Sequence, residues 1–398
     1  METTRRDAPA TAARWPMVAA NVPRGEEMSG VTLVTGGAGF IGSHLARELL
    51  ERGNRVRVLD NFDALAHRDG PRVADAEIEL VEGDLRDPDR VRFALGGVDA
   101  VFHLGGVVGN GESMFEVRRA VDANAGGTAT LMEGLAARRD RVRRLVVASS
   151  MVVYGEGAYG CAEHGATGVA SRDLDRLRRR DWEPRCPRCD RPLSPVPVQE
   201  DEPLRPTSVY GITKRDQEEL ALVVGGAYGI EVVALRYLNV YGPGQALHNP
   251  YTGVAALFAA RILCGRPPRV FEDGGQLRDP IHVTDAVEAT LAAMTARGAP
   301  GQAINVGAGG SVTVLELART LCRLLAPGIQ PEVTGEFRAG DIRHCLADVR
   351  RARRLLGFAA RRSLDEGLEE LAEWVRRQTV EERGDEAVTA LRTRGLVA

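Results

Sequence analysis

The chain has 398 residues, 44% hydrophobic and 27% charged, which is the composition of a globular protein large enough for two lobes. Its formal net charge of −3 gives no reason to expect a nucleic acid or a membrane surface as partner, and no apolar run approaches the roughly 18 residues of a membrane span. Six cysteines in a chain of this length suit the reducing cytoplasm better than a disulfide scaffold. Residues 1–29 are polar and lack the apolar core of a signal peptide, so we expect a disordered extension there and a cytoplasmic protein.

The first element after this extension is a strand that leads through a glycine-rich turn into a helix. The run VTLVT at 31–35 is rich in β-branched residues, and the amphipathic stretch 41–52 follows the glycines. The spacing G-x-x-G-x-x-G between them lets the backbone approach a pyrophosphate at the helix N-terminus. In this context the motif predicts a dinucleotide site. The residues expected to contact the dinucleotide here are Gly36, Gly39, Phe40, Ile41 and Gly42.

The second strand is expected to end at Asp60, 18 residues beyond Gly42. A carboxylate there can accept hydrogen bonds from a ribose 2′-OH and repels a 2′-phosphate, which favours NAD over NADP; the alternative is a solvated acid at a strand end. The runs IELVEGDL, VDAVFHLGG and RLVVASS continue the pattern of parallel strands. We therefore predict an α/β fold with a Rossmann-type doubly wound parallel sheet. The further residues expected to contact NAD are Asn61, Asp84, Leu85, Leu104 and Gly105.

A serine at a strand end and a Tyr-x-x-x-Lys pair form the candidate catalytic group. Ser150 ends the run RLVVASS, and VYGITK supplies Tyr210 and Lys214. On a helix this spacing places the tyrosine and the lysine on one face. An ammonium beside a phenol lowers the phenol's pKa, as would the positive charge of bound NAD, so that the tyrosine could exchange a proton with a substrate hydroxyl. Both residues would then also contact the cofactor. The alternative is an ordinary pair on a helix surface.

These motifs together resemble the extended short-chain dehydrogenase/reductase family, in its NAD-dependent nucleotide-sugar epimerase/dehydratase branch. The resemblance covers about residues 30–375, apart from an insert at 156–200. Its further matching segments are VDANAGGT around Asn124, RYLNVYGPGQ (236–245), RDPIHVTD (278–285), INVG (304–307) and GDIRHCLAD (340–348).

The resemblance implies a mechanism for the candidate group. Tyr210 would remove the proton from the sugar C4 hydroxyl as hydride passes to NAD, Ser150 would hydrogen-bond O4, and Lys214 would bind the nicotinamide ribose. The 4-keto sugar would take the hydride back on its other face, so that tightly bound NAD is recycled. Family dehydratases carry an Asp-Glu pair just after the serine, where this chain has Met151 and Val152, which have no proton to exchange. A 4-epimerase is therefore implied.

The C-terminal half is expected to bind a nucleotide-diphosphate sugar that is dTDP- or UDP-linked. By resemblance Asn239 would contact the sugar or diphosphate, and Arg278 and Arg343 would meet phosphate oxygens, unless they are solvated surface charges. Residues 249–285 resemble dTDP-L-rhamnose 4-epimerases, which implies conversion of dTDP-L-rhamnose to dTDP-6-deoxy-L-talose. The alternatives are UDP-glucose or UDP-glucuronate 4-epimerisation, a nucleotide-sugar dehydrogenase and a non-catalytic NAD-sensing protein.

The insert at 156–200 carries a C-x-x-H pair and a C-x-x-C pair. Three thiolates and one imidazole are the tetrahedral set that a structural zinc takes. The residues expected to bind it are Cys161, His164, Cys186 and Cys189. The remainder of the insert is charged and proline-rich with little apolar content, so a metal would supply its folding energy. The alternative is a flexible loop with reduced cysteines.

The predicted organisation follows from these segments. A zinc-knuckle-like insert interrupts the NAD-binding domain, and a smaller substrate-binding lobe follows it; the charged tail receives no role. The resemblance also implies a homodimer formed through a two-helix face. The predicted boundaries are 1–29 for the extension, 30–155 with 201–235 for the Rossmann domain, 156–200 for the insert, mainly 236–378 for the lobe and 379–398 for the tail.

Overall fold

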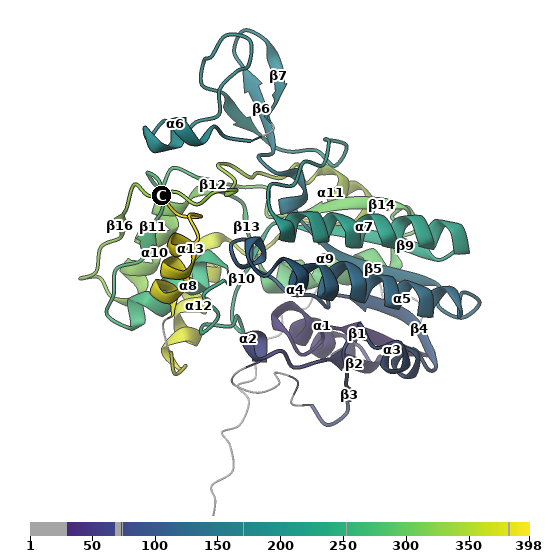
Figure 1. Ribbon diagram of the computed structural model, residues 1–398. Helices are drawn as coiled ribbons and strands as arrows, with labels where there is room; N and C mark the ends of the chain where they lie inside the picture. The colour runs from purple at the N-terminus through teal and green to yellow at the C-terminus, as the bar shows by residue number, and fades with distance from the viewer. Residues whose placement is uncertain (1–29, 68–72, 74, 170, 252, 381–382) are drawn as a thin grey trace, which may run out of the picture.

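Figure 1 shows three parts: a sheet covered by helices, a smaller lobe beside it, and an insert that projects from the top. The extension expected over residues 1–29 lies outside the described residues. None of the described helices is long and apolar enough to cross a membrane. The computed structural model describes residues 30–67, 73, 75–169, 171–251, 253–380 and 383–398.

The central sheet has seven strands, all parallel, in the order β14-β9-β5-β4-β1-β2-β3. The order reverses at β1, which has β2 on one side and β4 on the other, and ligands of such sheets bind at the carboxyl ends of the strands near this reversal. The predicted Rossmann-type sheet is therefore confirmed. The strands are β1 (Val31–Thr35), β2 (Arg55–Asp60), β3 (Glu79–Glu82), β4 (Val98–His103), β5 (Arg144–Ser150), β9 (Glu231–Tyr237) and β14 (Gln302–Val306).

Helices cover both faces of the sheet. α1, α9 and α11 pack on one face, and α3, α5 and α7 pack on the other, so each face buries its own apolar core. The helices are α1 (Phe40–Glu51), α3 (Pro88–Ala94), α5 (Gly127–Ala136), α7 (Val209–Tyr228), α9 (Val283–Thr295) and α11 (Arg350–Leu356). Shorter elements between them are α2 (Ala64–His67), η1 (Glu112–Met114), α4 (Val117–Val121), η2 (Asp122–Gly126) and η3 (Met151–Tyr154).

The smaller lobe is built from three helices and three two-stranded sheets. The apolar faces of the helices meet in a separate core. Two of these helices begin at capping boxes, formed by Thr313 with Glu316 and by Ser363 with Glu366. The elements are β10 (Asn239–Tyr241), α8 (Val254–Leu263), β11 (Arg269–Val270), β12 (Leu277–Arg278), β13 (Pro280–His282), β15 (Val312–Thr313), α10 (Val314–Leu325), β16 (Glu332–Val333) and α12 (Leu364–Arg376).

The range 236–378 that the sequence assigns mainly to the lobe is divided in the structure. α9 packs on the central sheet, and β14 extends that sheet by pairing with β9 in parallel. The reason is burial: Ile304 and Val306 of β14 are fully buried, which a strand at the surface of the lobe would not achieve. The chain thus crosses to the lobe, returns to the sheet and crosses again.

The insert forms a small antiparallel sheet with one short helix. The middle strand β6 (Ala158–Cys161) pairs with β7 (Gly165–Gly168) on one side and with β8 (Ser194–Val196) on the other. The charged stretch between the two ligand pairs contains α6 (Leu174–Arg178), which Asp173 caps by accepting a hydrogen bond from the Arg176 N–H.

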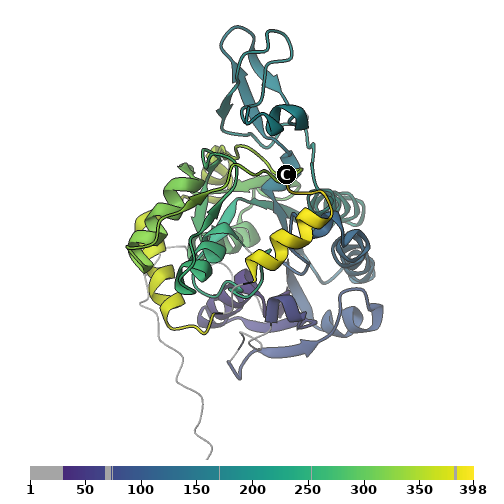
Figure 2. The ribbon, with the colours of Figure 1, turned by 60° about the vertical axis from the view of Figure 1, so that its left-hand side comes forward.

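The tail, to which the sequence assigned no role, contains the helix α13 (Gly384–Thr393). In Figure 2 this yellow helix crosses the front of the molecule. It connects the lobe with the half that contains the central sheet, since the Arg394 guanidinium lies 4.3 Å from the centre of the Phe115 ring. Beyond the helix, Ala398 exchanges two backbone hydrogen bonds with Phe337 of the lobe.

A buried ion pair fastens α7 to the sheet. The Arg236 guanidinium of β9 pairs with the Glu218 carboxylate of α7, and both side chains are at most 5% exposed. The Ser149 hydroxyl donates a hydrogen bond to Glu218 at 2.6 Å, and Arg236 also donates to the Tyr154 hydroxyl. Charges buried this deeply are tolerated only when they are paired and hydrogen-bonded.

We expect the substitution Arg236→Met to destabilise the protein by about 3–5 kcal/mol, because it leaves a buried carboxylate without its partner. The matched control is Arg215→Met, which breaks a pair with Glu219 whose side chains are 42% and 50% exposed and should cost less than about 1 kcal/mol. Urea unfolding of both variants measures the difference. Equal losses would show that burial of the pair has no energetic consequence.

Candidate functional site

The glycine-rich turn lies between β1 and α1, at the carboxyl edge of the sheet. Gly36 has a φ of +65°, and a Cβ atom there would lie 2.7 Å from the Gly105 Cα of the neighbouring β4 loop. A Cβ on Gly42 would lie 2.2 Å from the Gly36 carbonyl oxygen. Gly39 stands at the N-cap of α1 without a capping side chain, so the first backbone N–H groups of the helix are available to an anion. The turn therefore fits a dinucleotide pyrophosphate.

Asp60 and Asp84 lie at the ends of the next two strands, as the sequence suggested. The Asp60 carboxylate accepts hydrogen bonds from the N–H groups of Ala38 and Phe62, both at 3.0 Å, so it also braces the glycine turn. Asp84 accepts a hydrogen bond from Asn61. Hydrogen bonds from Arg86 hold the pKa of Asp84 well below its usual range. Asp84 is thus anionic, and both acids lie at the edge where the cofactor ribose and adenine are expected.

Leu104 and Gly105 follow β4 and complete the edge. The Leu104 N–H donates to the Thr35 carbonyl, and the Gly105 N–H donates to the Thr35 hydroxyl. A Cβ on Gly105 would lie 2.5 Å from the Leu85 side chain, so only glycine fits between β1 and this leucine. The structure therefore brings the residues predicted for the cofactor together along one edge.

The candidate catalytic side chains meet at the end of β5. α7 begins at Val209 because the Ser208 side chain caps it by accepting a hydrogen bond from the Gly211 N–H. Ser150 at the end of β5 and Tyr210 on α7 lie close enough for the serine hydroxyl to lower the pKa of the phenol. The Lys214 ammonium, one turn further along α7, donates to the Ala148 carbonyl of β5 at 2.8 Å.

The electrostatics of this group differ from the sequence-based expectation. Lys214 was expected to lower the pKa of the phenol, but burial raises the pKa of Tyr210 to about 12, against the opposing hydrogen bond with Ser150. Burial also lowers the pKa of Lys214 to about 8. Desolvation dominates both shifts because the two side chains are enclosed between the sheet and the lobe.

Sequence reasoning did not identify a buried polar network beside Lys214. The His103 imidazole bonds Thr35 through Nδ1 at 2.7 Å and lies 2.9 Å from the Thr128 hydroxyl and 3.2 Å from the Gln217 amide through Nε2. Burial, followed by the Lys214 charge, lowers the pKa of His103 to about 3, so this ring is neutral. The signal in the sequence was a histidine that ends the strand VDAVFH directly after the apolar run AVF.

An apolar wall lies against the Tyr210 ring. It consists of Val152 and Met151, which follow Ser150, and of Ile342 and Cys345 from the lobe. Met151 and Val152 are the two residues that stand where family dehydratases carry an Asp-Glu pair, and they distinguished the epimerase branch in the sequence. The wall carries no acid or base among its side chains except the buried Cys345 thiol, whose pKa burial raises to about 12.

The two arginines predicted to meet phosphate oxygens are committed to the protein itself. Arg278 donates to the backbone carbonyls of Leu277, Arg343 and Ile342, at 2.7–2.9 Å. Arg343 is 3% exposed and pairs with Glu183, Glu272 and Asp273. All three nitrogens of its guanidinium are used in these contacts, which leaves none pointing to a ligand.

Arg338, five residues before Arg343 in the chain, has a guanidinium with free hydrogen-bond donors. Arg338 donates from Nε to Asp341 at 2.6 Å and lies over the Phe271 ring at 4.8 Å, whereas its two terminal nitrogens donate to no residue that the structure describes. On β10, the Asn239 Oδ1 is buried and has no hydrogen-bond partner within the described part of the chain. Sequence motifs did not distinguish Arg338 from Arg343, because the difference depends on distant carboxylates.

The four predicted metal ligands come together in the insert. Their ligand atoms all lie within 4.8 Å of one another. The Cys161 sulfur is 3.7 Å from the Cys189 sulfur, and the His164 Nδ1 is 3.5 Å from Cys161 and 3.4 Å from Cys186. Backbone N–H groups of Glu163 and His164 hydrogen-bond the Cys161 sulfur and contribute to its lowered pKa, which favours the thiolate.

Comparison with known proteins agrees with this site. The model of the NAD dependent epimerase/dehydratase family matches residues 32–170 and 190–307. A dTDP-L-rhamnose 4-epimerase of Burkholderia thailandensis is 33% identical over 351 residues, which cover 86% of this chain and 94% of that protein. The chain therefore belongs to the NAD-dependent epimerase/dehydratase family, among relatives that are nucleotide-sugar epimerases and hence isomerases. The family predicted from the sequence is confirmed.

Solved structures resemble the chain over nearly its whole length. MoeE5 in complex with UDP-glucuronic acid and NAD is 34% identical with a TM-score of 0.69, covering 87% of this chain and 99% of that one. The UDP-glucose 4-epimerase of Thermotoga maritima, solved with UDP-glucose, is 29% identical with a TM-score of 0.72 and the same coverage. NAD is thus bound in a related structure with the same sheet.

We expect Gly42→Ala to abolish NAD binding, because the added Cβ would press on the Gly36 carbonyl and open the turn. The matched control is Gly226→Ala, an exposed position of α7 where a Cβ meets nothing within 4 Å; it should keep NAD. Release of NAD from the denatured purified variants, measured by absorbance and enzymatic cycling, tests both. Full NAD content in Gly42→Ala would contradict the fit of the turn.

Proposed function

We propose that this protein is a nucleotide-sugar 4-epimerase that interconverts dTDP-L-rhamnose and dTDP-6-deoxy-L-talose. The observation that carries the proposal is the placement of Ser150 beside Tyr210, with the phenol against the apolar wall and the dinucleotide turn at the same edge of the sheet. NAD, when bound at the turn, would supply hydride acceptance and return at C4. The chain's own part is to hold O4 and to move its proton.

The roles of the side chains follow from their placement. The Tyr210 hydroxyl is the proton-exchanging atom at O4, and the Ser150 hydroxyl bonds the same oxygen, which orients C4. Lys214 stands one turn from Tyr210 with its ammonium held by the Ala148 carbonyl, where it would bind the nicotinamide ribose. Burial of the group excludes water from the reacting atoms.

The apolar wall supports a 6-deoxy sugar. A methyl group at C6 is compatible with Met151, Val152 and Ile342, whereas the carboxylate of a glucuronate would need a cation or hydrogen-bond donors there. Arg278 does not serve, since both of its terminal nitrogens donate to backbone carbonyls. The Burkholderia relative supports the same substrate. UDP-glucose is the second candidate, because several relatives and the Thermotoga structure are UDP-glucose 4-epimerases.

We propose that the lobe binds the nucleotide-diphosphate sugar through Asn239 and Arg338. The free terminal nitrogens of Arg338 supply donors for the diphosphate, and the buried Asn239 oxygen supplies an acceptor for a hydroxyl of the sugar. A planar guanidinium with both terminal nitrogens free suits two phosphate oxygens. Arg278 and Arg343 do not bind the phosphates in this proposal. They hold the segment that carries Arg338.

We propose that the insert binds one structural zinc. Zinc bonds of about 2.3 Å to sulfur and 2.0 Å to nitrogen in a tetrahedron place sulfurs about 3.8 Å apart and a sulfur about 3.5 Å from the nitrogen. The separations of 3.7, 3.5 and 3.4 Å in the insert support this geometry. Four protein ligands leave no open position, so the metal would have a structural role.

We also propose a homodimer through α4 and α7. Large hydrophobic side chains are exposed on these two helices, which is a feature of interfaces. They are Val117, Val121, Ile212, Val223 and Tyr228.

We expect the purified enzyme, without added NAD, to convert dTDP-L-rhamnose to an equilibrium mixture with dTDP-6-deoxy-L-talose. Proton NMR of the sugar ring measures this conversion. Tyr210→Phe should lower kcat by about 10²–10⁴-fold and keep bound NAD, because only the proton-exchanging hydroxyl is lost. Tyr228→Phe, at the exposed end of the same helix, is the control and should retain activity. Conversion of UDP-glucose or UDP-glucuronate alone would replace the proposed sugar; no conversion of any of the three would reject the reaction.

We expect about one zinc per chain by plasma mass spectrometry of protein purified without chelator. The double variant Cys186→Ser, Cys189→Ser should lose the metal, since two of four ligands are removed. Cys264→Ser changes an exposed cysteine outside the cluster and should keep it. Wild-type protein free of zinc, or unchanged zinc in the double variant, would rule the site out.

A further inference from the structure

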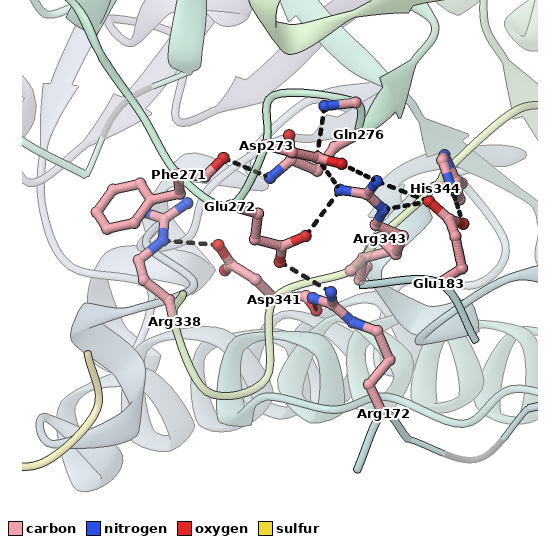
Figure 3. A network of polar contacts seen from close by, with 12 residues as sticks. Arg172, Glu183, Phe271, Glu272, Asp273, Gln276, Arg338, Asp341, Arg343 and His344 are labelled. Carbon is pink, nitrogen blue, oxygen red and sulfur yellow. Dashed lines mark hydrogen bonds and ion pairs between the residues drawn. The ribbon is translucent and has the colours of Figure 1, made fainter. Parts of the chain in front are cut away.

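The insert contacts the lobe chiefly at residues 337–344, a segment that contains Arg338, and also at Glu272. Figure 3 shows the polar part of this attachment, in which Arg172 and Glu183 of the insert reach lobe residues on both sides of the Arg343 guanidinium. Three contacts carry the argument, two of them polar and one apolar.

The first contact is a buried cation between two buried carboxylates. The Arg172 side chain is 4% exposed and lies 3.1 Å from Glu156 and 2.8 Å from Glu272. It also donates to the Asp341 carbonyl oxygen at 2.7 Å. Glu272 has a φ of +54°, a strained conformation for a residue with a side chain, and its carboxylate is shared by Arg172 and Arg343. Removing one charge from this network would leave a buried charge without a partner, which strongly lowers the stability of the folded protein.

The second contact is made by Glu183. Its carboxylate accepts hydrogen bonds from the Arg343 guanidinium at 2.6 and 2.9 Å and lies 2.9 Å from the His344 Nε2. Burial alone would raise the pKa of Glu183, but the hydrogen bonds of His344 and Arg343 outweigh it and lower that pKa. The carboxylate is therefore ionised and fixes two consecutive lobe residues.

The third contact is apolar. Trp182 and Leu177 of the insert bury themselves against Phe337, whose ring centre lies 6.5 Å from that of Trp182. Phe337 directly precedes Arg338 in the chain. The insert thus contacts the residue before Arg338 and several residues after it.

Other elements hold only parts of this segment. Ala398 bonds the backbone of Phe337, and the Thr207 hydroxyl donates to the Gly340 carbonyl. Asp341, which orients the Arg338 side chain through Nε, has its own carbonyl held by Arg172. The backbone of Arg338 is bridged to Val397 of the C-terminal segment, and the direction of its side chain depends on the insert through Asp341.

We infer that the insert positions Arg338 for the nucleotide diphosphate of the substrate, and that Arg172 and Glu183 are positioning residues for nucleotide binding. This inference rests on the proposed nucleotide-sugar function, and it deepens that function by assigning the insert to recognition of the diphosphate end. Neither residue is placed at the sugar, and both act through the segment they hold.

The test is Glu183→Gln in the full-length protein. We expect the KM for the nucleotide sugar to rise about tenfold, which corresponds to roughly 1.4 kcal/mol, with kcat changed less than about twofold. The matched control is Asp175→Asn, which breaks an exposed pair with Arg178 in the same insert and should leave KM unchanged. Glu183→Asp retains the charge and should recover part of the loss.

A second measurement needs no turnover. Calorimetric binding of dTDP and of UDP to the NAD-loaded proteins should weaken by the same factor in Glu183→Gln, while NAD and zinc contents stay at the wild-type level. Unchanged nucleotide affinity, or a loss confined to kcat, would overturn the inference. If wild-type protein epimerises none of the sugars but the variant still binds nucleotide more weakly, the proposed 4-epimerase reaction is rejected and the positioning role of Glu183 is retained. If wild-type protein binds neither dTDP nor UDP, both the reaction and the positioning role are rejected.

Discussion

The buried pair of Arg236 and Glu218 is the interaction on which the site depends. It fastens α7 to the sheet within one turn of Lys214, and the Ser149 hydroxyl, which bonds the same carboxylate, directly precedes Ser150. The relative position of β5 and α7 is therefore set by a charge pair that water does not reach. A serine and a tyrosine from separate elements can hold one substrate oxygen only if that position is constant.

The fold could be predicted because its signals are local. A β-branched run, three glycines and an amphipathic stretch occur within twenty-two residues, and each restricts the backbone by its own chemistry. The four-residue spacing of Tyr210 and Lys214 and the paired cysteines and histidine of the insert are equally local. Helix periodicity and a hairpin suffice to bring such residues near each other.

The rest could not be predicted because it depends on contacts between distant residues. Arg338 and Arg343 are indistinguishable in the sequence, and only the carboxylates of Glu183 and Glu272, far away in the chain, decide which guanidinium remains free. The pKa of Tyr210 is dominated by burial beneath the lobe rather than by its neighbouring lysine. The spacing of residues in the sequence indicates neither which guanidinium is free nor how strongly burial shifts the pKa of Tyr210.

The insert begins and ends at the same place. Ala158 and Val196 are paired across β6 and β8, so the chain leaves the host fold and returns to it across a gap of about 5 Å. The ends of the host loop need not move to enclose a longer segment, so the central sheet places little constraint on the length of the loop. The constraint lies instead in the lobe, where Glu272 and Arg343 would lose their buried partners if the insert were exchanged for another module.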